Sequence, residues 1–199
     1  MSMKNKDPKK VITGPRTRWS FVHVWEPAAI NEKSEPKYSV SLIIPKDDKK
    51  TLKSIQAAMK AAYDEGLDRL KGNSKSAPTF AAVKKPLHDG DAERPDDEAY
   101  QNAFYIGATN KTAPSVVDTA MQPIIDRNEV YSGCYGRASI TFRTYNYSNG
   151  TSKGIGCYLN HLQKVADGEP LGGARASAEE DFADLDDEDD DIDEDFLWS

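Results

Sequence analysis

The sequence predicts one mainly β domain with a single helix between its early and late strands, followed by an acidic tail. Short runs of aromatic and β-branched residues recur along the chain and end at prolines or glycines, as strands do. One stretch, 47–71, instead places apolar residues at helical spacing. From 179 to 195 the chain has 13 acidic residues and no basic one. We therefore divide the 199 residues into a basic flexible arm (1–15), a folded domain (16–173) and a disordered tail (174–199).

Two runs after the arm, RWSFVHVWEP (18–27) and KYSVSLIIP (37–45), predict strands that end at prolines. Alternation in the first run requires one set of large side chains to face the core, and we expect this set to include Phe21 and Trp25. A bulge would invert half of the assignment. This assignment leaves Arg16, Arg18 and Trp19 near a binding surface.

The stretch 47–71 is the one helix that the sequence predicts, with Asp47 or Asp48 as its N-cap. Its lysines fit a solvated face better than a binding site, because charged residues opposite an apolar stripe are the ordinary amphipathic pattern. The apolar stripe consists of Leu52, Ile55, Met59, Ala62, Gly66, Leu67 and Leu70.

Residues 72–100 are polar and interrupted by prolines, and a loop of this length is usually functional or disordered. We include its Lys84 and Lys85 among the candidate contacts. Asp89 and Asp91 suggest a metal site, but they do not complete the ligand spacing of a calcium loop, so a surface turn is favoured. Two short strands, AFYIGATN and APSVVDT, follow and are joined around Lys111.

The late part of the domain predicts a long hairpin around Asn149-Gly150, because this dipeptide is a strong hairpin signal between β-like runs. With these residues at the centre of the turn, paired positions sum to 299. The register then gives one mainly apolar face. On that face Ala138, Ile140, Phe142 and Thr144 lie opposite His161, Leu159, Cys157 and Ile155.

The second face of this hairpin combines arginines, tyrosines and glycines. Unpaired bases can stack on tyrosines at roughly 1 to 3 kcal/mol each, while arginines follow the phosphates. Packing against a second layer or a dimer contact is an equally good interpretation of the tyrosines alone. Tyr135 extends this face beyond possible breaks at glycines. In this register Arg137, Thr141, Arg143, Tyr145 and Tyr147 lie opposite Leu162, Tyr158, Gly156, Gly154 and Ser152.

The net charge of -7 hides two opposite parts. Of the 33 acidic residues, 13 lie in 179–195, which leaves 20 acidic against 26 basic residues in 1–178, a net +6. A basic body with an acidic tail favours a nucleic-acid partner. The tail also contains apolar residues, so it resembles a recognition segment for other proteins. Its negative charge can also compete with nucleic acid for the basic body. Its candidate partner-binding residues are Asp189, Asp190, Asp191, Asp193, Glu194, Asp195, Phe196 and Trp198.

Enzyme chemistry has little support, and we expect neither a catalytic site nor a cofactor nor a metal. The three histidines lack metal-ligand spacing, and no phosphate loop or nucleophile motif is present. No apolar stretch approaches the roughly 20 residues of a membrane span, and the N-terminus has no secretory pattern. Two cysteines indicate a reducing cytoplasm, and the hairpin register separates them, so we expect no disulfide.

Four segments in order, PLHDGD, FYIGATNKTAPSVVD, GRASITFRTYNY and GIGCYLNHLQKVADGEPLGG, resemble the single-stranded DNA-binding proteins of tailed phages over most of 15–173. The terminal DDDIDEDFLWS is similar in kind to the acidic tails of phage and bacterial single-stranded DNA-binding proteins. It departs from the bacterial form, which ends in Pro-Phe, because Leu197, Trp198 and Ser199 follow Phe196.

This resemblance implies an OB-fold-like Greek-key barrel that sequesters unwound DNA during phage replication and recombination. It implies the cytoplasm of the infected bacterium as location and replication proteins as partners of the tail. The candidate nucleic-acid contacts come from the residues themselves rather than from the family. They are Arg137, Arg143, Tyr145, Tyr147, Tyr158, Tyr135, Arg16, Arg18, Trp19, Lys84, Lys85 and Lys111.

Two alternatives stay open at this point. The same surface could serve an RNA-binding or strand-annealing protein. In a virion or assembly scaffold, the tyrosine face would be a subunit contact and the tail would only solubilise. Duplex DNA remains a weaker candidate ligand, because a basic body can hold duplex phosphates without reading bases. A homodimer is compatible with the sequence.

Overall fold

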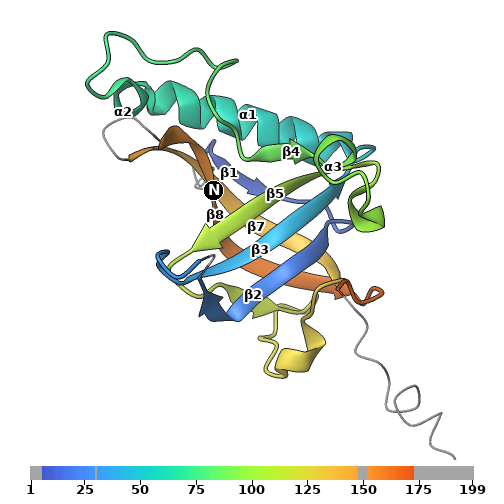
Figure 1. Ribbon diagram of the computed structural model, residues 1–199. Helices are drawn as coiled ribbons and strands as arrows, with labels where there is room; N and C mark the ends of the chain where they lie inside the picture. The colour runs from blue at the N-terminus through green and yellow to red at the C-terminus, as the bar shows by residue number, and fades with distance from the viewer. Residues whose placement is uncertain (1–5, 30, 148–151, 173–199) are drawn as a thin grey trace, which may run out of the picture.

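The structure is a computed structural model that describes residues 6–29, 31–147 and 152–172 (Figure 1). Strands dominate, and the helices lie mainly between the early and the late strands, as predicted. In chain order the elements are β1 (Lys10–Ile12), β2 (Arg18–Ala28), β3 (Lys37–Pro45), α1 (Lys49–Glu65), α2 (Leu67–Lys71), β4 (Leu87–Asp89), α3 (Gly90–Glu93), η1 (Glu98–Tyr100), β5 (Ala103–Asn110), β6 (Ser115–Val117), η2 (Arg127–Glu129), β7 (Tyr135–Tyr147) and β8 (Ser152–Ala166).

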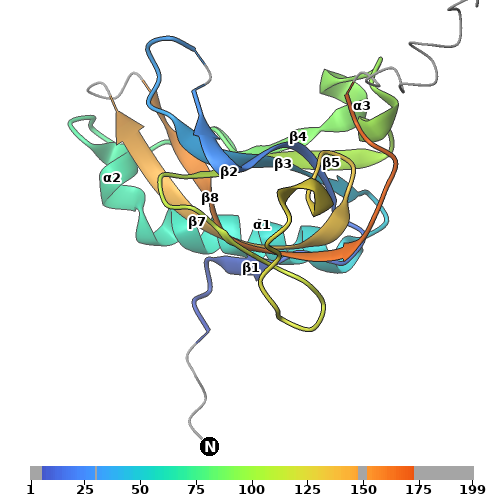
Figure 2. The same ribbon diagram turned by 90° about the horizontal axis from the view of Figure 1, so that it is seen from below.

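Five strands close into a barrel in the order β2, β3, β5, β8, β7 and back to β2 (Figure 2). The β5–β8 pair is parallel, and the other four pairs are antiparallel. Closure removes exposed strand edges from the barrel. It also encloses one face of the sheet, so the apolar side chains of that face pack against one another without a second sheet. The order is that of the OB-fold-like Greek-key barrel that we expected. Three short strands extend it: β1 pairs with β7, β6 with β8 and β4 with β5.

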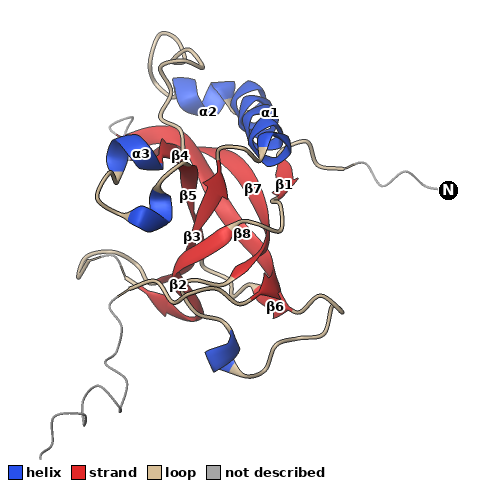
Figure 3. Cartoon of the chain, turned by 90° about the vertical axis from the view of Figure 1, so that its right-hand side faces the viewer, coloured by secondary structure: helices blue, strands red, loops and turns tan. Residues whose placement is uncertain are grey.

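The barrel interior holds a continuous apolar core, in which alternate residues of each barrel strand point inward. Helix α1 packs against β1, β7 and β8 and adds Ile55, Met59 and Ala62 to this core. Figure 3 shows α1 and η2 at opposite ends of the barrel, and β1 and α3 on opposite sides of it. Large side chains buried in this core include Trp19, Leu42, Ile44, Ile106, Ile140, Phe142 and Leu159.

Helix α1 begins at Asp48, one of the two predicted caps, whose carboxylate accepts from the backbone N–H of Thr51 at 3.1 Å. It ends at Gly66, where a Cβ would collide with the side chain of Thr144 on β7. Glycine therefore permits close packing between the helix end and the hairpin.

The orientation that we predicted for β2 is wrong at Trp19 and Phe21. Trp19 is fully buried in the core, so it is excluded as a nucleic-acid contact, whereas Phe21 is 53% exposed. The reason is a bulge between Ser20 and His23, which pair with Ser41 and Ser39 of β3. Phe21 takes a positive φ of 48° there and turns outward. Trp25 is half-buried against the core, on the side that we expected.

The hairpin register is confirmed from Tyr147–Ser152 to Ile140–Leu159. A bulge at Asn160 then shifts the pairing by one residue, because the Asn160 amide donates outward to the hydroxyl oxygen of Thr141 at 2.9 Å. His161 is therefore exposed and not on the core face as predicted. Asn149 and Gly150 lie outside the described residues. Beyond the bulge, Ser139, Ala138 and Arg137 pair with His161, Leu162 and Gln163.

Two further segments differ from the sequence-based expectations. The predicted flexible arm contains β1, because Val11 is buried and the hydroxyl of Thr13 accepts from the N–H of Ala138 at 2.9 Å. The predicted loop 72–100 contains β4, α3 and η1. Within it, Asp89 and Asp91 both bind the ammonium of Lys46, at 2.7 and 2.6 Å, so they have a structural role as in the favoured turn interpretation.

Candidate nucleic-acid interface

Five side chains from the hairpin and the segment beside it form one surface, which we call the hairpin cluster: Lys84, Arg143, Tyr145, Tyr147 and Tyr158. The rings of Tyr145 and Tyr147 stack with centroids 5.5 Å apart and an interplanar angle of 19°. The guanidinium carbon of Arg143 lies 5.7 Å from the ring centroid of Tyr158. Burial, with smaller contributions from Tyr147, raises the pKa of the Tyr158 phenol, so this group is a neutral hydrogen-bond donor at physiological pH.

Two glycines of β8 shape this cluster. A Cβ at Gly154 would lie 2.9 Å from the hydroxyl oxygen of Tyr145, and one at Gly156 would lie 3.6 Å from Cδ1 of the same ring. The Tyr145 ring therefore lies in the space that the missing side chains of these glycines leave. Tyr147 is 60% exposed and stacks on Tyr145, whose own ring lies over Gly154 and Gly156. Part of the Tyr147 ring is therefore available for another aromatic group.

Two lysines that the sequence singled out lie at this surface. Lys84 is exposed and forms a parallel bridge with Gly154, and its carbonyl accepts from the N–H of Ile155 at 2.9 Å. Lys111 lies near Tyr147 and forms an ion pair with Glu35 at 2.7 Å, which raises the pKa of the lysine. Lys84 therefore contributes a cation that no described carboxylate pairs with, whereas the charge of Lys111 is compensated.

The outer face of β3 and β5 carries small residues next to this cluster. Ser39 and Ser41 alternate with buried Val40 and Leu42 along β3, and they pair with Thr109 and Gly107 of β5. Gly107 is exposed, and nothing lies within 4 Å of a Cβ placed on it. Thr109 pairs with Tyr158, so this small-residue strip is continuous with the hairpin cluster. The strip comprises Ser39, Ser41, Gly107 and Thr109.

A second aromatic group, which sequence reasoning missed, lies at the other end of the strip and surrounds Arg94. The guanidinium carbon of Arg94 lies 5.3 Å from the ring centroid of Phe21, 4.6 Å from Tyr100 and 5.4 Å from Tyr105. His88 stacks on Tyr105 with centroids 5.1 Å apart. We call this set the Arg94 cluster: Phe21, His88, Arg94, Tyr100 and Tyr105.

Glu93 holds the polar side of the Arg94 cluster together. Its carboxylate contacts Nδ1 of His88 at 2.9 Å and accepts from the hydroxyl of Tyr105 at 3.1 Å. The hydrogen bond from His88 lowers the pKa of Glu93, whereas burial raises the pKa of Tyr105. The alternation of Tyr105, Gly107 and Thr109 along β5 was the one signal in the sequence for this face. Nothing local indicated that Arg94 would lie over it.

Other predicted contacts lie elsewhere. The guanidinium of Arg18 lies 5.3 Å from the ring centroid of Tyr135 and donates to the carbonyl oxygens of Gly133 and Glu169, at 3.3 and 2.6 Å. Both Arg18 and Tyr135 are half-buried. Their contacts connect β2 to the chain after β8, and they are not part of the hairpin cluster.

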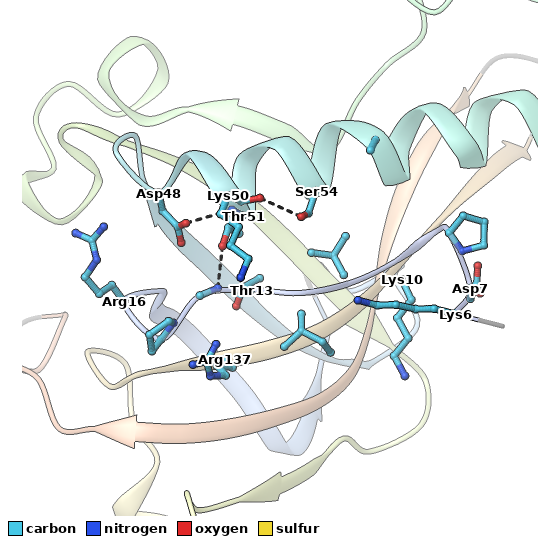
Figure 4. Close-up of a pocket in the computed structure, with 16 residues that line it drawn as sticks. Lys6, Asp7, Lys10, Thr13, Arg16, Asp48, Lys50, Thr51, Ser54 and Arg137 are labelled. Atoms are coloured by element: carbon cyan, nitrogen blue, oxygen red, sulfur yellow. Dashed lines mark hydrogen bonds between the residues drawn. The ribbon is translucent and has the colours of Figure 1, made fainter. Parts of the chain in front are cut away.

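Arg16 and Arg137 line a separate basic pocket of about 680 Å³ next to β1 and the start of α1 (Figure 4). Figure 4 shows Lys10 and Lys50 beside it as well, with Asp48 on the helix side. Arg16 also forms an ion pair with Asp47 at 2.8 Å. The structure therefore places Arg137 with the arm and the helix rather than with Arg143, although both are exposed residues of β7.

Lys85 faces α1, away from the hairpin cluster. Its ammonium lies 4.6 Å from the ring centroid of Phe80 and donates to the carbonyl oxygen of Val83 at 3.3 Å. The predicted partner-binding residues of 174–199 lie outside the described residues. Within the described ranges, no group of three or more His, Cys, Asp or Glu side chains could hold a metal ion. None of the helices in these ranges is long and apolar enough to span a membrane.

The chain matches the family described as Enterobacter phage Enc34, ssDNA-binding protein, over residues 9–196. It is 29% identical to protein p50 of Acyrthosiphon pisum secondary endosymbiont phage 1 over 174 residues, which cover 84% of this chain and 90% of that protein. A solved structure of the single-stranded DNA-binding protein from bacteriophage Enc34 in complex with ssDNA is 28% identical. Its TM-score is 0.61, and the match covers 82% of this chain and 90% of that chain.

The fold is also similar to that of gp2.5, a single-stranded DNA-binding protein encoded by bacteriophage T7. That match has a TM-score of 0.56 at 16% identity and covers 91% of this chain and 96% of the T7 protein.

Proposed function

Because the chain belongs to the Enterobacter phage Enc34 family of ssDNA-binding proteins, we propose that it binds single-stranded DNA independently of base sequence, through the hairpin cluster. The family consists of binding proteins rather than enzymes, in agreement with the prediction of no catalytic site. The observation that carries the proposal is the stacked pair of Tyr145 and Tyr147 beside the cations of Arg143 and Lys84. Stacking on such rings is tolerant of sequence because every base has a π-face.

The DNA path continues from the hairpin cluster over the small-residue strip to the Arg94 cluster. In OB-folds the face of the second and third barrel strands binds oligonucleotides, and these strands are β3 and β5 here. Small residues let a strand of DNA approach the sheet closely, while the two clusters at its ends provide aromatic and cationic contacts. Tyr105 and Thr109 are four residues apart on β5, so the clusters are separated by about 13 Å.

The acidic tail has two proposed roles. Its carboxylates compete with DNA for the basic body, an effect that salt weakens. Its apolar residues recruit replication proteins, which would give the protein its role in phage replication and recombination in the cytoplasm of the infected bacterium. The 13 acidic residues of 179–195 and the aromatic residues that follow support both roles.

Duplex DNA is a second, weaker ligand in this proposal. The basic pocket beside β1 has several cations and lacks the aromatic pair, which suits phosphates better than unstacked bases. Its contacts would carry no base specificity. Strand β1, whose residues line this pocket, lies on the side of the barrel opposite α3 (Figure 3). Duplex binding there need not use the Arg94 cluster.

Fluorescence anisotropy of labelled oligo-dT tests the proposed function. We expect the association constant to fall with salt by about 0.7 log unit per log unit of salt for each phosphate neutralised. Matched RNA and duplex competitors measure the preference for single-stranded DNA. A chain that does not bind oligo-dT, or binds it without any salt dependence, would contradict the proposal.

A further inference from the structure

A pocket of about 540 Å³ lies between α1, the segment 80–87 and β5, and it belongs to none of the surfaces described above. Met59 of α1 is buried in its floor, at 3% exposure. Half-buried apolar side chains surround this floor, so the site offers partly uncovered hydrophobic surface in a concave shape. These side chains are Leu52, Phe80, Leu87 and Phe104.

Lysines form the rim of this pocket. Lys49 and Lys53 are exposed on α1, and the ammonium of Lys85 lies over the ring of Phe80. None of the three forms an ion pair among the residues that the structure describes. Lys46 and Lys60 approach the rings of Phe104 and Phe80 as well, at 5.1 and 5.8 Å, but aspartates already neutralise both of them.

We propose that the chain's own terminal segment, Asp193–Trp198, docks in this lysine-rimmed pocket. The segment reads Asp-Glu-Asp-Phe-Leu-Trp, so three carboxylates precede three large apolar side chains. The pocket offers the complementary arrangement of three uncompensated ammonium groups around an apolar floor. Phe196 or Trp198 fills the floor, and the carboxylates meet the rim.

The tail is long enough to reach the pocket within one molecule. The described chain ends at Gly172, which leaves the 20 residues 173–192 before the docking segment. A flexible chain of that length has a root-mean-square span of about 25 Å. A folded domain of this size has a radius of gyration of only about 16 Å. The effective concentration of the segment at its own pocket therefore exceeds that of another copy at micromolar protein.

This anchor is independent of DNA binding. It needs the apolar residues of the tail as well as its charge, whereas the competition proposed above needs charge alone. Docking would hold the acidic run beside the barrel and would hide Phe196 and Trp198 until a partner protein with a stronger site displaces them.

Paramagnetic relaxation enhancement on the full chain tests the proposal. Ser199→Cys provides a single site for a nitroxide label, because Cys134 and Cys157 are buried and burial raises the pKa of the Cys157 thiol. We expect the label to broaden the methyl signal of Met59 and the amide signals of 49–56 and 80–87. Those signals should recover when Phe196 and Trp198 are both changed to serine.

Two lysine variants provide a matched pair on the same helix. Lys53→Glu should reduce the broadening at Met59. Lys50→Glu should not, because Lys50 lines the basic pocket beside β1 instead. Broadening at Arg143–Tyr147 instead of Met59 would overturn the proposal. So would broadening in unlabelled ¹⁵N chains mixed with labelled ¹⁴N chains, since the tail would then come from a second copy. None of these readouts requires DNA, so the proposal can fail while the proposed function holds.

Discussion

The hairpin cluster and the Arg94 cluster have similar chemistry but are built in different ways. The hairpin cluster comes mainly from two adjacent strands, and its geometry follows from one antiparallel register with glycines opposite Arg143 and Tyr145. The Arg94 cluster takes its members from β2, β4, η1, β5 and the residue after α3. A bulge and exposed polar contacts hold that cluster together. The proposed DNA path therefore combines a cluster formed by one local strand register with a cluster assembled from segments that are distant in the sequence.

The largest expected effect on oligo-dT binding comes from changing the hairpin cluster. Arg143→Ala with Tyr147→Ala removes a phosphate cation and the more exposed ring of the stacked pair. We expect oligo-dT binding to weaken by about 2 to 4 kcal/mol, which is roughly 30- to 1,000-fold. Anisotropy titration at fixed low salt measures this change. A thermal melt checks that the domain remains folded, and unchanged affinity in a folded variant would show that the hairpin is not the binding face.

The Arg94 cluster should contribute less to oligo-dT binding. Arg94→Ala removes the cation that lies over three rings, and we expect binding to weaken by about 1 to 2 kcal/mol. Arg127→Ala is a suitable control, because Arg127 is an exposed arginine that forms an ion pair with Glu26 and belongs to neither cluster. The same titration measures both variants. An equal effect of the two substitutions would mean that Arg94 acts only through net charge.

A substitution at Gly107 tests whether bound DNA crosses the small-residue strip between the hairpin cluster and the Arg94 cluster. A side chain there meets nothing in the protein, so Gly107→Leu should change the free energy of unfolding by less than about 0.5 kcal/mol. It should nevertheless weaken oligo-dT binding by about 1 kcal/mol, because DNA must move away from the strand face. Gly154→Ala should instead lower the free energy of unfolding, since its Cβ would meet Tyr145 and the carbonyl oxygen of Lys84. Normal DNA binding by Gly107→Leu would place the DNA path elsewhere.

The smallest expected effect is on the stability of the fold at acid pH. The pKa of Glu93 is lowered from its ordinary 4.5, chiefly by its hydrogen bond with His88. The contact therefore stabilises the fold above pH 4.5, and this stabilisation is lost as the pH falls through the lowered pKa. Glu93→Gln should lose less stability than the parent chain between pH 5 and 3 in a series of thermal melts. Parallel curves for the two proteins would show that the contact contributes nothing in solution.

Sequence reasoning succeeded where structure is local. The end of β3 at Pro45, the Asp48 cap and the register from Ile140 to Tyr147 all depend on neighbours along the chain or on one turn, whereas β2 continues one residue past Pro27 to Ala28. It failed at the two bulges, at Phe21 and at Asn160. One extra residue there changes which side chains face outward, and nothing in the alternation shows it.

The candidate site also contains one part that depends on local contacts and one part that depends on distant ones. Five of the twelve predicted contacts form the hairpin cluster, because the hairpin register determines most of their positions. Trp19 is buried, and Arg18 and Tyr135 support the chain after β8. The Arg94 cluster could not be predicted, because it depends on how an insertion between α2 and β5 folds back over the sheet.

The most direct test of whether the hairpin cluster and the Arg94 cluster lie on one DNA path is a length series of oligo-dT. Affinities are measured for the parent chain and for Arg94→Ala. We expect equal affinities for short oligomers, which fill only the hairpin cluster. The ratio of the two dissociation constants should then rise to a plateau once the DNA spans the strip. If the ratio is the same at every length, whether it equals one or exceeds one, the two clusters do not lie on one DNA path.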